Sequence, residues 1–204
     1  MIPFLTNGPA RPRITLALAH GAGAAMDSPF LETMAEEIAG NGIRVVRFEF
    51  PYMRERRKSG KRGAPDRPAV LLETWKEVVA HFGADKLAIG GKSMGGRIAS
   101  MVADEAGVRA LVCLGYPFHP PGKPERLRTE HLAALRTPTL IVQGTRDAFG
   151  SKDDVASYDL SSAIRVVWVE GGDHSLKPPA KNPRTEAECL AFAAETVKEF
   201  LQRA

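Results

Sequence analysis

The sequence lacks the marks of several protein classes. No apolar run approaches the roughly 18 residues of a membrane-spanning helix. Its first residues lack a charged segment followed by a long apolar stretch, so we expect no signal peptide. The chain has two cysteines, Cys113 and Cys189, and both lie in apolar segments. This favours free, buried thiols and a cytoplasmic location, with no membrane association.

Motifs that bind metals or nucleotides are also missing. The sequence contains no G-x-x-x-x-G-K-[ST], no H-E-x-x-H and no paired C-x-x-C. The glycines of GAGAA at 21–25 do not have the spacing of a dinucleotide fingerprint. We therefore expect no metal and no cofactor.

The excess of positive over negative charge lies in one segment. The 204 residues include 28 Lys/Arg and 24 Asp/Glu, a net charge of +4. Residues 52–68 hold seven of the basic and two of the acidic residues, which leaves 21 basic and 22 acidic residues elsewhere. A nucleic-acid-binding surface spread over the whole chain is therefore not expected. This segment is the one linker-like stretch of the sequence, and it does not divide the chain.

The rest of the chain alternates between two patterns. Short apolar runs rich in β-branched residues predict buried strands, and apolar residues at helical spacing predict helices between them. The predicted strands are 14–19, 43–50, 86–89, 110–114, 139–142 and 165–169, and the predicted helices are 29–39, 68–82, 94–106 and 185–201. This order predicts one α/β domain over residues 1–204, with a mostly parallel sheet of six or seven strands flanked by helices.

One turn between a predicted strand and a predicted helix carries a nucleophile motif. Gly91-Lys92-Ser93-Met94-Gly95 fits G-x-S-x-G, and the motif has meaning only in this strand–turn–helix setting. The turn is so tight that side chains two residues before or after Ser93 would collide with neighbouring elements, which glycine avoids. Ser93 would then be exposed at a helix N-terminus, where negative charge is favoured. The alternative is a serine that only caps the helix.

Several motifs together resemble a known family. GGKSMGGRIAS, GTRD and GGDHSL, in this order, resemble the α/β-hydrolase superfamily, in particular its compact dienelactone-hydrolase-like members. HGAGA, FPYM, GKSMGGR and GYPFHPPGKPE further resemble a subfamily of small hydrolases that includes subunits of an animal chromatin-acetylating complex. The resemblance runs from about residue 14 to 201. It implies this fold and a Ser-His-Asp triad, and it does not imply a substrate.

A serine nucleophile needs a base and a group that orients the base. His174 follows the last predicted strand, and the order Ser…Asp…His is the one that this fold uses. Asp147 follows the strand 139–142 and is the predicted acid. The rival base is His20, for which the resemblance implies a loop-shaping role. The rival acids are Asp153, Asp154 and Asp173, and Asp147 could instead cap the following segment.

An oxyanion intermediate needs preorganised donors. We expect the backbone N–H of Met94 to be one. The other should come from the HGAG segment, from Ala22 or alternatively from Gly21 or Gly23. Lys92 is expected on the other side of the turn, with a structural or electrostatic role.

The expected substrate pocket is shallow, because only residues 115–137 separate two predicted strands where many relatives carry a cap. A large cap domain does not fit there, which favours small or short-acyl esters. Ordinary core packing is the alternative for the candidate wall residues. These are Tyr52, Met53, Tyr116, Phe118, His119 and Phe149.

Two classes of function remain open. The triad residues favour a carboxylic-ester hydrolase over a non-catalytic scaffold, and a thioesterase or amidase would use the same residues. The basic residues 54–67 form either a mobile lip that binds an anionic ligand or acidic partner, or a solvated loop paired with local acids.

Overall fold

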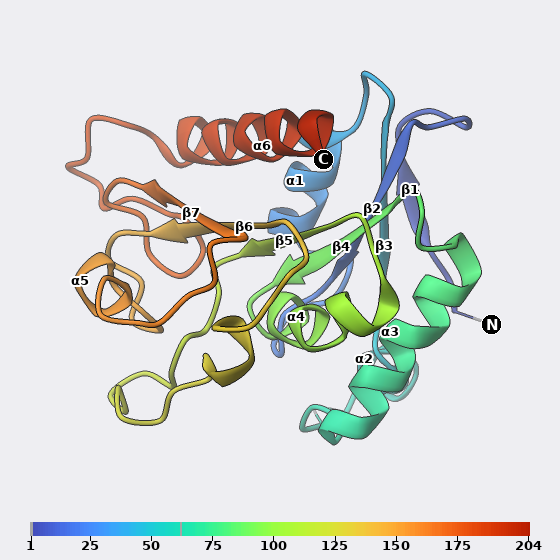
Figure 1. Cartoon of the computed structure of the whole chain (residues 1–204), viewed down its shortest axis with the longest axis horizontal. Coiled ribbons are helices and arrows are strands. Elements are labelled where there is room, and N and C mark those ends of the chain that lie inside the picture. The colour runs from blue at the N-terminus through green and yellow to red at the C-terminus, as the bar shows by residue number, and fades with distance from the viewer. Residues whose placement is uncertain (1, 62) are drawn as a thin grey trace.

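A seven-stranded sheet runs through the molecule in the computed structural model, which describes residues 2–61 and 63–204 (Figure 1). The strand order is β1-β3-β2-β4-β5-β6-β7; β1 pairs antiparallel with β3, and all other pairs are parallel. The predicted fold class is confirmed, and β1 is the strand that was not predicted. The strands are β1 (Leu5–Asn7), β2 (Ile14–Ala19), β3 (Ile43–Phe48), β4 (Leu87–Lys92), β5 (Ala110–Leu114), β6 (Thr139–Gly144) and β7 (Ile164–Val169).

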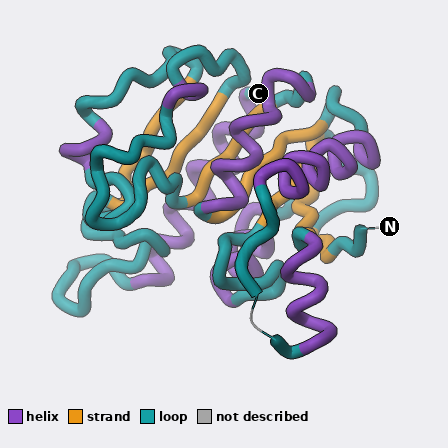
Figure 2. Tube along the Cα trace, turned by 90° about the horizontal axis from the view of Figure 1, so that it is seen from below, coloured by secondary structure: helices purple, strands orange, loops and turns teal. Residues whose placement is uncertain are grey.

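Helices cover both faces of this sheet (Figures 1 and 2). α1 (Pro29–Ile38) and α6 (Glu186–Arg203) pack together on one face. α3 (Pro68–Phe82) and α4 (Met94–Ala106) cover the other, with α2 (Pro51–Ser59) beside them. The short α5 (Lys152–Val155) and the 3₁₀ turn η1 (Glu130–Leu132) lie in loops.

Burial on both faces explains why the central strands are continuously apolar. All six residues of β2 are buried. Leu16 and Leu18 belong to the core layer under α1 and α6, whereas Ala17 and Ala19 belong to the layer under α3 and α4. Alternate residues of a strand point to opposite faces, so a strand covered on both sides shows no polar alternation.

The linker-like prediction for residues 52–68 is wrong in its first half. α2 begins at Pro51 and ends at Ser59. Gly60 follows it with a left-handed φ of 69°. Proline at the start and glycine just past the end are helix signals that the high charge obscured. Tyr52 and Met53 are the buried residues of α2, so this half of the segment is packed against the rest of the protein. Arg62 lies outside the described residues.

The loop between β5 and β6 has little regular secondary structure. Between Leu114 and Thr139 it contains η1 and turns, which agrees with the predicted absence of a large cap. Within residues 2–61 and 63–204, no helix has the length and apolar character needed to cross a bilayer.

Candidate active site

Four segments that are far apart in the sequence meet at the carboxyl edge of the parallel sheet. The HGAG segment follows β2, Ser93 follows β4, Asp147 follows β6 and His174 follows β7. Loops at this edge of an open parallel sheet commonly form the ligand site, because the helices leave a crevice there.

The turn at Ser93 is as tight as the sequence predicts. Ser93 has φ 53° and ψ −117°, a conformation that costs a non-glycine residue about 1–3 kcal/mol. A Cβ on Gly91 would lie 2.2 Å from the Ala19 carbonyl oxygen, and one on Gly95 would lie 2.5 Å from the same atom. The two glycines therefore let the turn approach the end of β2, with Ser93 at the N-terminus of α4.

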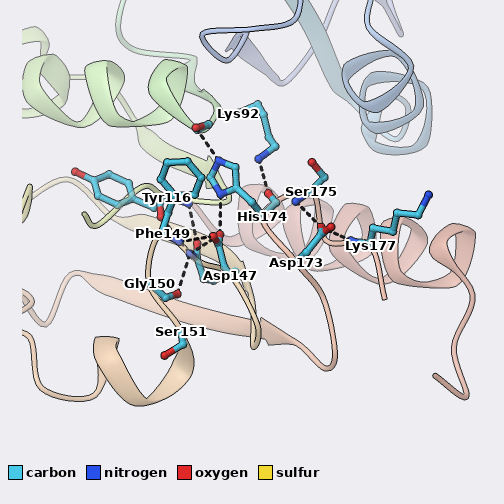
Figure 3. A network of polar contacts seen from close by, with 12 residues as sticks. Lys92, Tyr116, Asp147, Phe149, Gly150, Ser151, Asp173, His174, Ser175 and Lys177 are labelled. Atoms are coloured by element: carbon cyan, nitrogen blue, oxygen red, sulfur yellow. Dashed lines mark hydrogen bonds and ion pairs between the residues drawn. The ribbon is translucent and has the colours of Figure 1, made fainter. Parts of the chain in front are cut away.

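The side chains of Ser93, His174 and Asp147 form one hydrogen-bonded chain (Figure 3). Nε2 of His174 lies 2.8 Å from Oγ of Ser93, and Nδ1 lies 2.8 Å from Oδ2 of Asp147. Asp147 is 1% exposed and accepts the Nδ1–H, which leaves Nε2 as the acceptor for the Ser93 hydroxyl. The arrangement can remove a proton from Ser93 and hold it on the imidazole.

Gln143 positions Asp147, although it was not among the site residues predicted from the sequence. Its Nε2 donates to Oδ2 of Asp147 at 2.8 Å, and the Phe149 N–H donates to Oδ1 at 2.8 Å. Gln143 is fully buried and also bonds both backbone groups of Tyr116. A lone amide within the apolar strand TLIVQG, four residues before Asp147, was the available signal.

The rival acids are engaged elsewhere. Asp154 forms a capping box with Ser151, the N-cap of α5, and hydrogen bonds from Ser151 lower the pKa of the Asp154 carboxyl group. Asp153 is exposed on the same short helix. Asp173 accepts backbone N–H bonds from Ser175 at 2.7 Å and Lys177 at 3.0 Å, within its own loop.

The rival base is also occupied. Nδ1 of His20 donates to the Gly21 carbonyl at 2.7 Å, and Nε2 accepts the Phe50 N–H at 3.2 Å. Burial lowers the pKa of His20, so its ring is neutral and joins the HGAG segment to the end of β3. This contact is structural, and His20 does not bond Ser93.

Two backbone donors lie free at the site. The N–H groups of Met94 and Ala22 bond no acceptor in the described part of the chain. The Tyr52 hydroxyl donates to the carbonyls of Ala22 at 3.1 Å and Gly21 at 3.4 Å, which fixes the HGAG segment from behind. Gly21 and Gly23 border the same cavity, so the choice among the three residues stays a prediction.

A cavity of about 410 Å³ opens beside Ser93. Of the six predicted wall residues, Phe149 alone lines it, with its ring stacked on His174 at 4.1 Å between centroids. The N-terminus of α1 supplies the apolar lining residues Pro29, Phe30 and Leu31. The lining residues are Gly21, Ala22, Gly23, Ala24, Ser28, Pro29, Phe30, Leu31, Lys92, Ser93, Phe149, His174 and Ser175.

The other five predicted wall residues lie elsewhere, which corrects the prediction. Tyr116 and Phe118 are fully buried, and His119 is 4% exposed, because the loop after β5 folds into the core. Tyr52 lies behind the HGAG segment, and Met53 borders a neighbouring cavity. For these residues the core-packing alternative describes the structure better.

The fold recurs among solved structures. A serine hydrolase homologue from Coxiella burnetii has 21% identity and a TM-score of 0.68, with 99% of this chain and 90% of that chain covered. A lidless serine hydrolase from Xanthomonas campestris has 17% identity, a TM-score of 0.73 and coverage of 99% and 88%. A dienelactone hydrolase from Anabaena variabilis has 20% identity, a TM-score of 0.71 and coverage of 99% and 91%.

Comparison with a protein-family model identifies the family of the chain. The model of the alpha/beta hydrolase domain matches residues 12–202, which is nearly the whole chain. This match agrees with the sheet order and with the resemblance of the sequence motifs to that superfamily. The chain therefore belongs to the alpha/beta hydrolase domain family.

Proposed function

We propose that the protein is a serine hydrolase that cleaves small or short-acyl carboxylic esters through an acyl-enzyme. The observation that carries the proposal is the chain of two 2.8 Å contacts from Ser93 through His174 to buried Asp147. Three solved structures of this fold are described as serine hydrolases or a dienelactone hydrolase, which supports the same chemistry.

Acylation begins at Ser93. As Oγ attacks the ester carbonyl carbon, its proton moves to Nε2 of His174, and the carbonyl oxygen becomes an oxyanion. The N–H groups of Met94 and Ala22 stabilise that oxyanion. Asp147 stabilises the imidazolium. The C–O bond then breaks, and the alcohol leaves with the proton from His174.

Water completes the cycle. It gives one proton to His174 while its oxygen attacks the acyl carbon, and the new oxyanion uses the same two donors. When the intermediate collapses, Oγ of Ser93 recovers the proton from Nε2. The carboxylic acid is released, and the free enzyme is restored.

Two measurements test this proposal. A fluorophosphonate probe should label Ser93, which a non-catalytic scaffold related to chromatin-complex subunits would not show on a folded sample. A panel of activated esters, thioesters and amides of equal acyl length should then show fastest turnover for the esters. Faster turnover of the thioesters or amides would assign the same triad to that reaction class.

Acyl-chain preference follows from the cavity. Because it is open, holds about 410 Å³ and has no cap over it, it offers no long apolar tunnel. Chains of roughly two to six carbons should give higher kcat/KM than chains beyond about ten carbons. A p-nitrophenyl ester series measures this, and a maximum at long chains would contradict the proposed pocket.

The basic segment places one positive charge, that of Arg56, near the active site, where it could attract anionic ligands. Arg57 is fixed by Asp27 at 2.8 Å and by buried Glu49 at 2.6 Å. Arg56 has no ion pair in the described residues and borders a cavity that shares Gly23 with the active site. We infer that Arg56 attracts anionic substrates or an acidic partner to this edge.

Replacing Arg56 by Gln should therefore lower kcat/KM for an anionic ester about two- to threefold at low ionic strength, and hardly at about 1 M salt. Lys198→Gln is the matched control, because Lys198 lies on α6 across the sheet. A loss that persists in high salt, or an equal loss in the control, would rule out steering by Arg56.

A further inference from the structure

Lys92, which was expected on the other side of the turn from Ser93 with a structural or electrostatic role, lies in the cavity wall. It is the residue before Ser93, and it lines the same cavity as Ser93 and His174. In Figure 3 its side chain turns toward the His174 backbone, where Nζ donates to the carbonyl oxygen. Lys92 thus contacts the segment that carries the base.

The fold leaves space for this ammonium group. A Cβ on Gly115, which has φ 67°, would lie 2.8 Å from Nζ of Lys92 and 2.6 Å from the His174 carbonyl oxygen. Nζ also lies 5.5 Å from the centre of the Phe30 ring, within the range of a cation–π contact. The ammonium is therefore held in one place at the cavity wall.

The charge of Lys92 is incompletely matched. No carboxylate forms an ion pair with it among the described residues, and of its three N–H donors the structure pairs one, with His174. Lys92 and His174 are the titratable side chains of the cavity wall, which is otherwise apolar or carries serine hydroxyls. A half-buried cation without a directly paired carboxylate costs free energy, so a ligand that supplies an anion would stabilise the site.

The N-terminus of α1 adds positive potential at the same place. Ser28, Pro29, Phe30 and Leu31 form the N-cap and first turn of this ten-residue helix, and all four line the cavity. The Ser28 side chain makes no capping hydrogen bond, so its hydroxyl is available to a ligand. Helix N-termini favour anions through their free N–H groups and the helix dipole.

We propose that Lys92, with the N-terminus of α1, binds a carboxylate carried by the substrate, so that the preferred substrates are esters with an anionic group. This inference rests on the proposed ester hydrolysis at Ser93. Lys92 is then a specificity-determining residue, and it differs from Arg56 because it acts by direct contact inside the cavity.

The test uses two activated esters of equal acyl length, one neutral and one with a terminal carboxylate. Lys92→Gln retains a donor for the His174 carbonyl and removes the charge. It should lower the ratio of kcat/KM values, carboxylate ester over neutral ester, about tenfold or more. Lys92→Met should lower the ratio similarly and also slow the neutral ester, because the contact with His174 is lost.

Salt and a control variant separate this contact from surface charge. Lys177→Gln removes an exposed lysine on the same loop as His174 and should leave the ratio unchanged. The effect of Lys92→Gln should persist at about 1 M salt, because buried pairs are screened much less than exposed ones. An unchanged ratio in both Lys92 variants would overturn the inference, and turnover of neither ester by the wild type would overturn the proposed function with it.

The ratio should also depend on pH. Burial lowers the pKa of Lys92 to about 8, against the opposing influence of the Asp147 and Asp173 carboxylates. The ammonium is charged below this pH and neutral above it, so the preference for the carboxylate ester should fade as pH rises through about 8. The neutral ester is the internal reference, because pH effects on the chemical steps that both esters share divide out of the ratio of kcat/KM values. A constant ratio from pH 6 to 10 would contradict recognition by the ammonium.

Discussion

Ser93→Ala should lower kcat on an activated short-chain ester by about three orders of magnitude or more, while the fold is retained. Without Oγ the acyl-enzyme cannot form, and we expect the remaining rate to come from binding and from the proposed backbone donors. Steady-state kinetics measures the loss. The fluorophosphonate label should disappear in the same variant.

Stability should be nearly unchanged in this variant, for a specific reason. Alanine keeps the Cβ, so the unusual backbone at Ser93, φ 53° and ψ −117°, is strained to the same degree before and after the substitution. Thermal unfolding checks this. Ser175→Ala is the matched control, because Ser175 lines the same cavity and makes no contact with His174 Nε2. If Ser93→Ala kept wild-type turnover, or if Ser175→Ala lost more, Ser93 would not be the nucleophile.

The part of the site that follows strand ends was predictable from the sequence. Ser93, Asp147 and His174 each come within a few residues of the end of an apolar run that forms a parallel strand, and such strands end at one edge of the sheet. Their meeting in space therefore follows from strand order. The helices 68–82 and 94–106 were predicted to the residue, because glycine or the nucleophile turn marks their ends.

The cavity wall was not predictable in this way. The local sequence around the aromatic residues after β5 is the same whether their side chains face a substrate or the core. The path of the loop in the folded protein decides which of the two they face. Tyr116 is fully buried because Gln143 holds its backbone against β6, a contact between distant residues. Phe30 has helical spacing, which predicts a core residue, but its place in the first turn of α1 puts it at the cavity.

The pairing of charges in residues 52–68 was also not predictable from the sequence. Arg57 and Glu49 are eight residues apart, and no sequence pattern specifies that they pair across the junction of β3 and α2. With Glu49 1% exposed, the pair belongs to the packed structure. A count of like charges predicted repulsion and mobility, whereas the first half of the segment is helical, with Arg57 paired and Arg56 available.

Asp147→Asn should lower kcat/KM by about three orders of magnitude near neutral pH, with little change in the overall fold. The carboxylate accepts three hydrogen bonds, from His174 and Gln143 at Oδ2 and from the Phe149 N–H at Oδ1. An amide cannot accept at both positions, because its NH₂ group faces a donor wherever it is placed. Either the hydrogen bond to His174 or the one to Phe149 is therefore lost.

Loss of charge adds to this effect in both orientations of the amide, because the imidazolium that forms on His174 no longer has a negative partner. Asp154→Asn and Asp173→Asn are the matched controls, since neither carboxylate bonds the His174 ring: Asp154 bonds Ser151 and lies 3.7 Å from Nε2 of His119, and Asp173 bonds backbone N–H groups of its own loop. They should retain kcat/KM within about threefold of the wild type, in keeping with the small effect of most polar substitutions away from a functional network. Should Asp154→Asn or Asp173→Asn show the larger loss, Asp147 would not be the residue that orients His174, and the 2.8 Å contact between them would be structural alone.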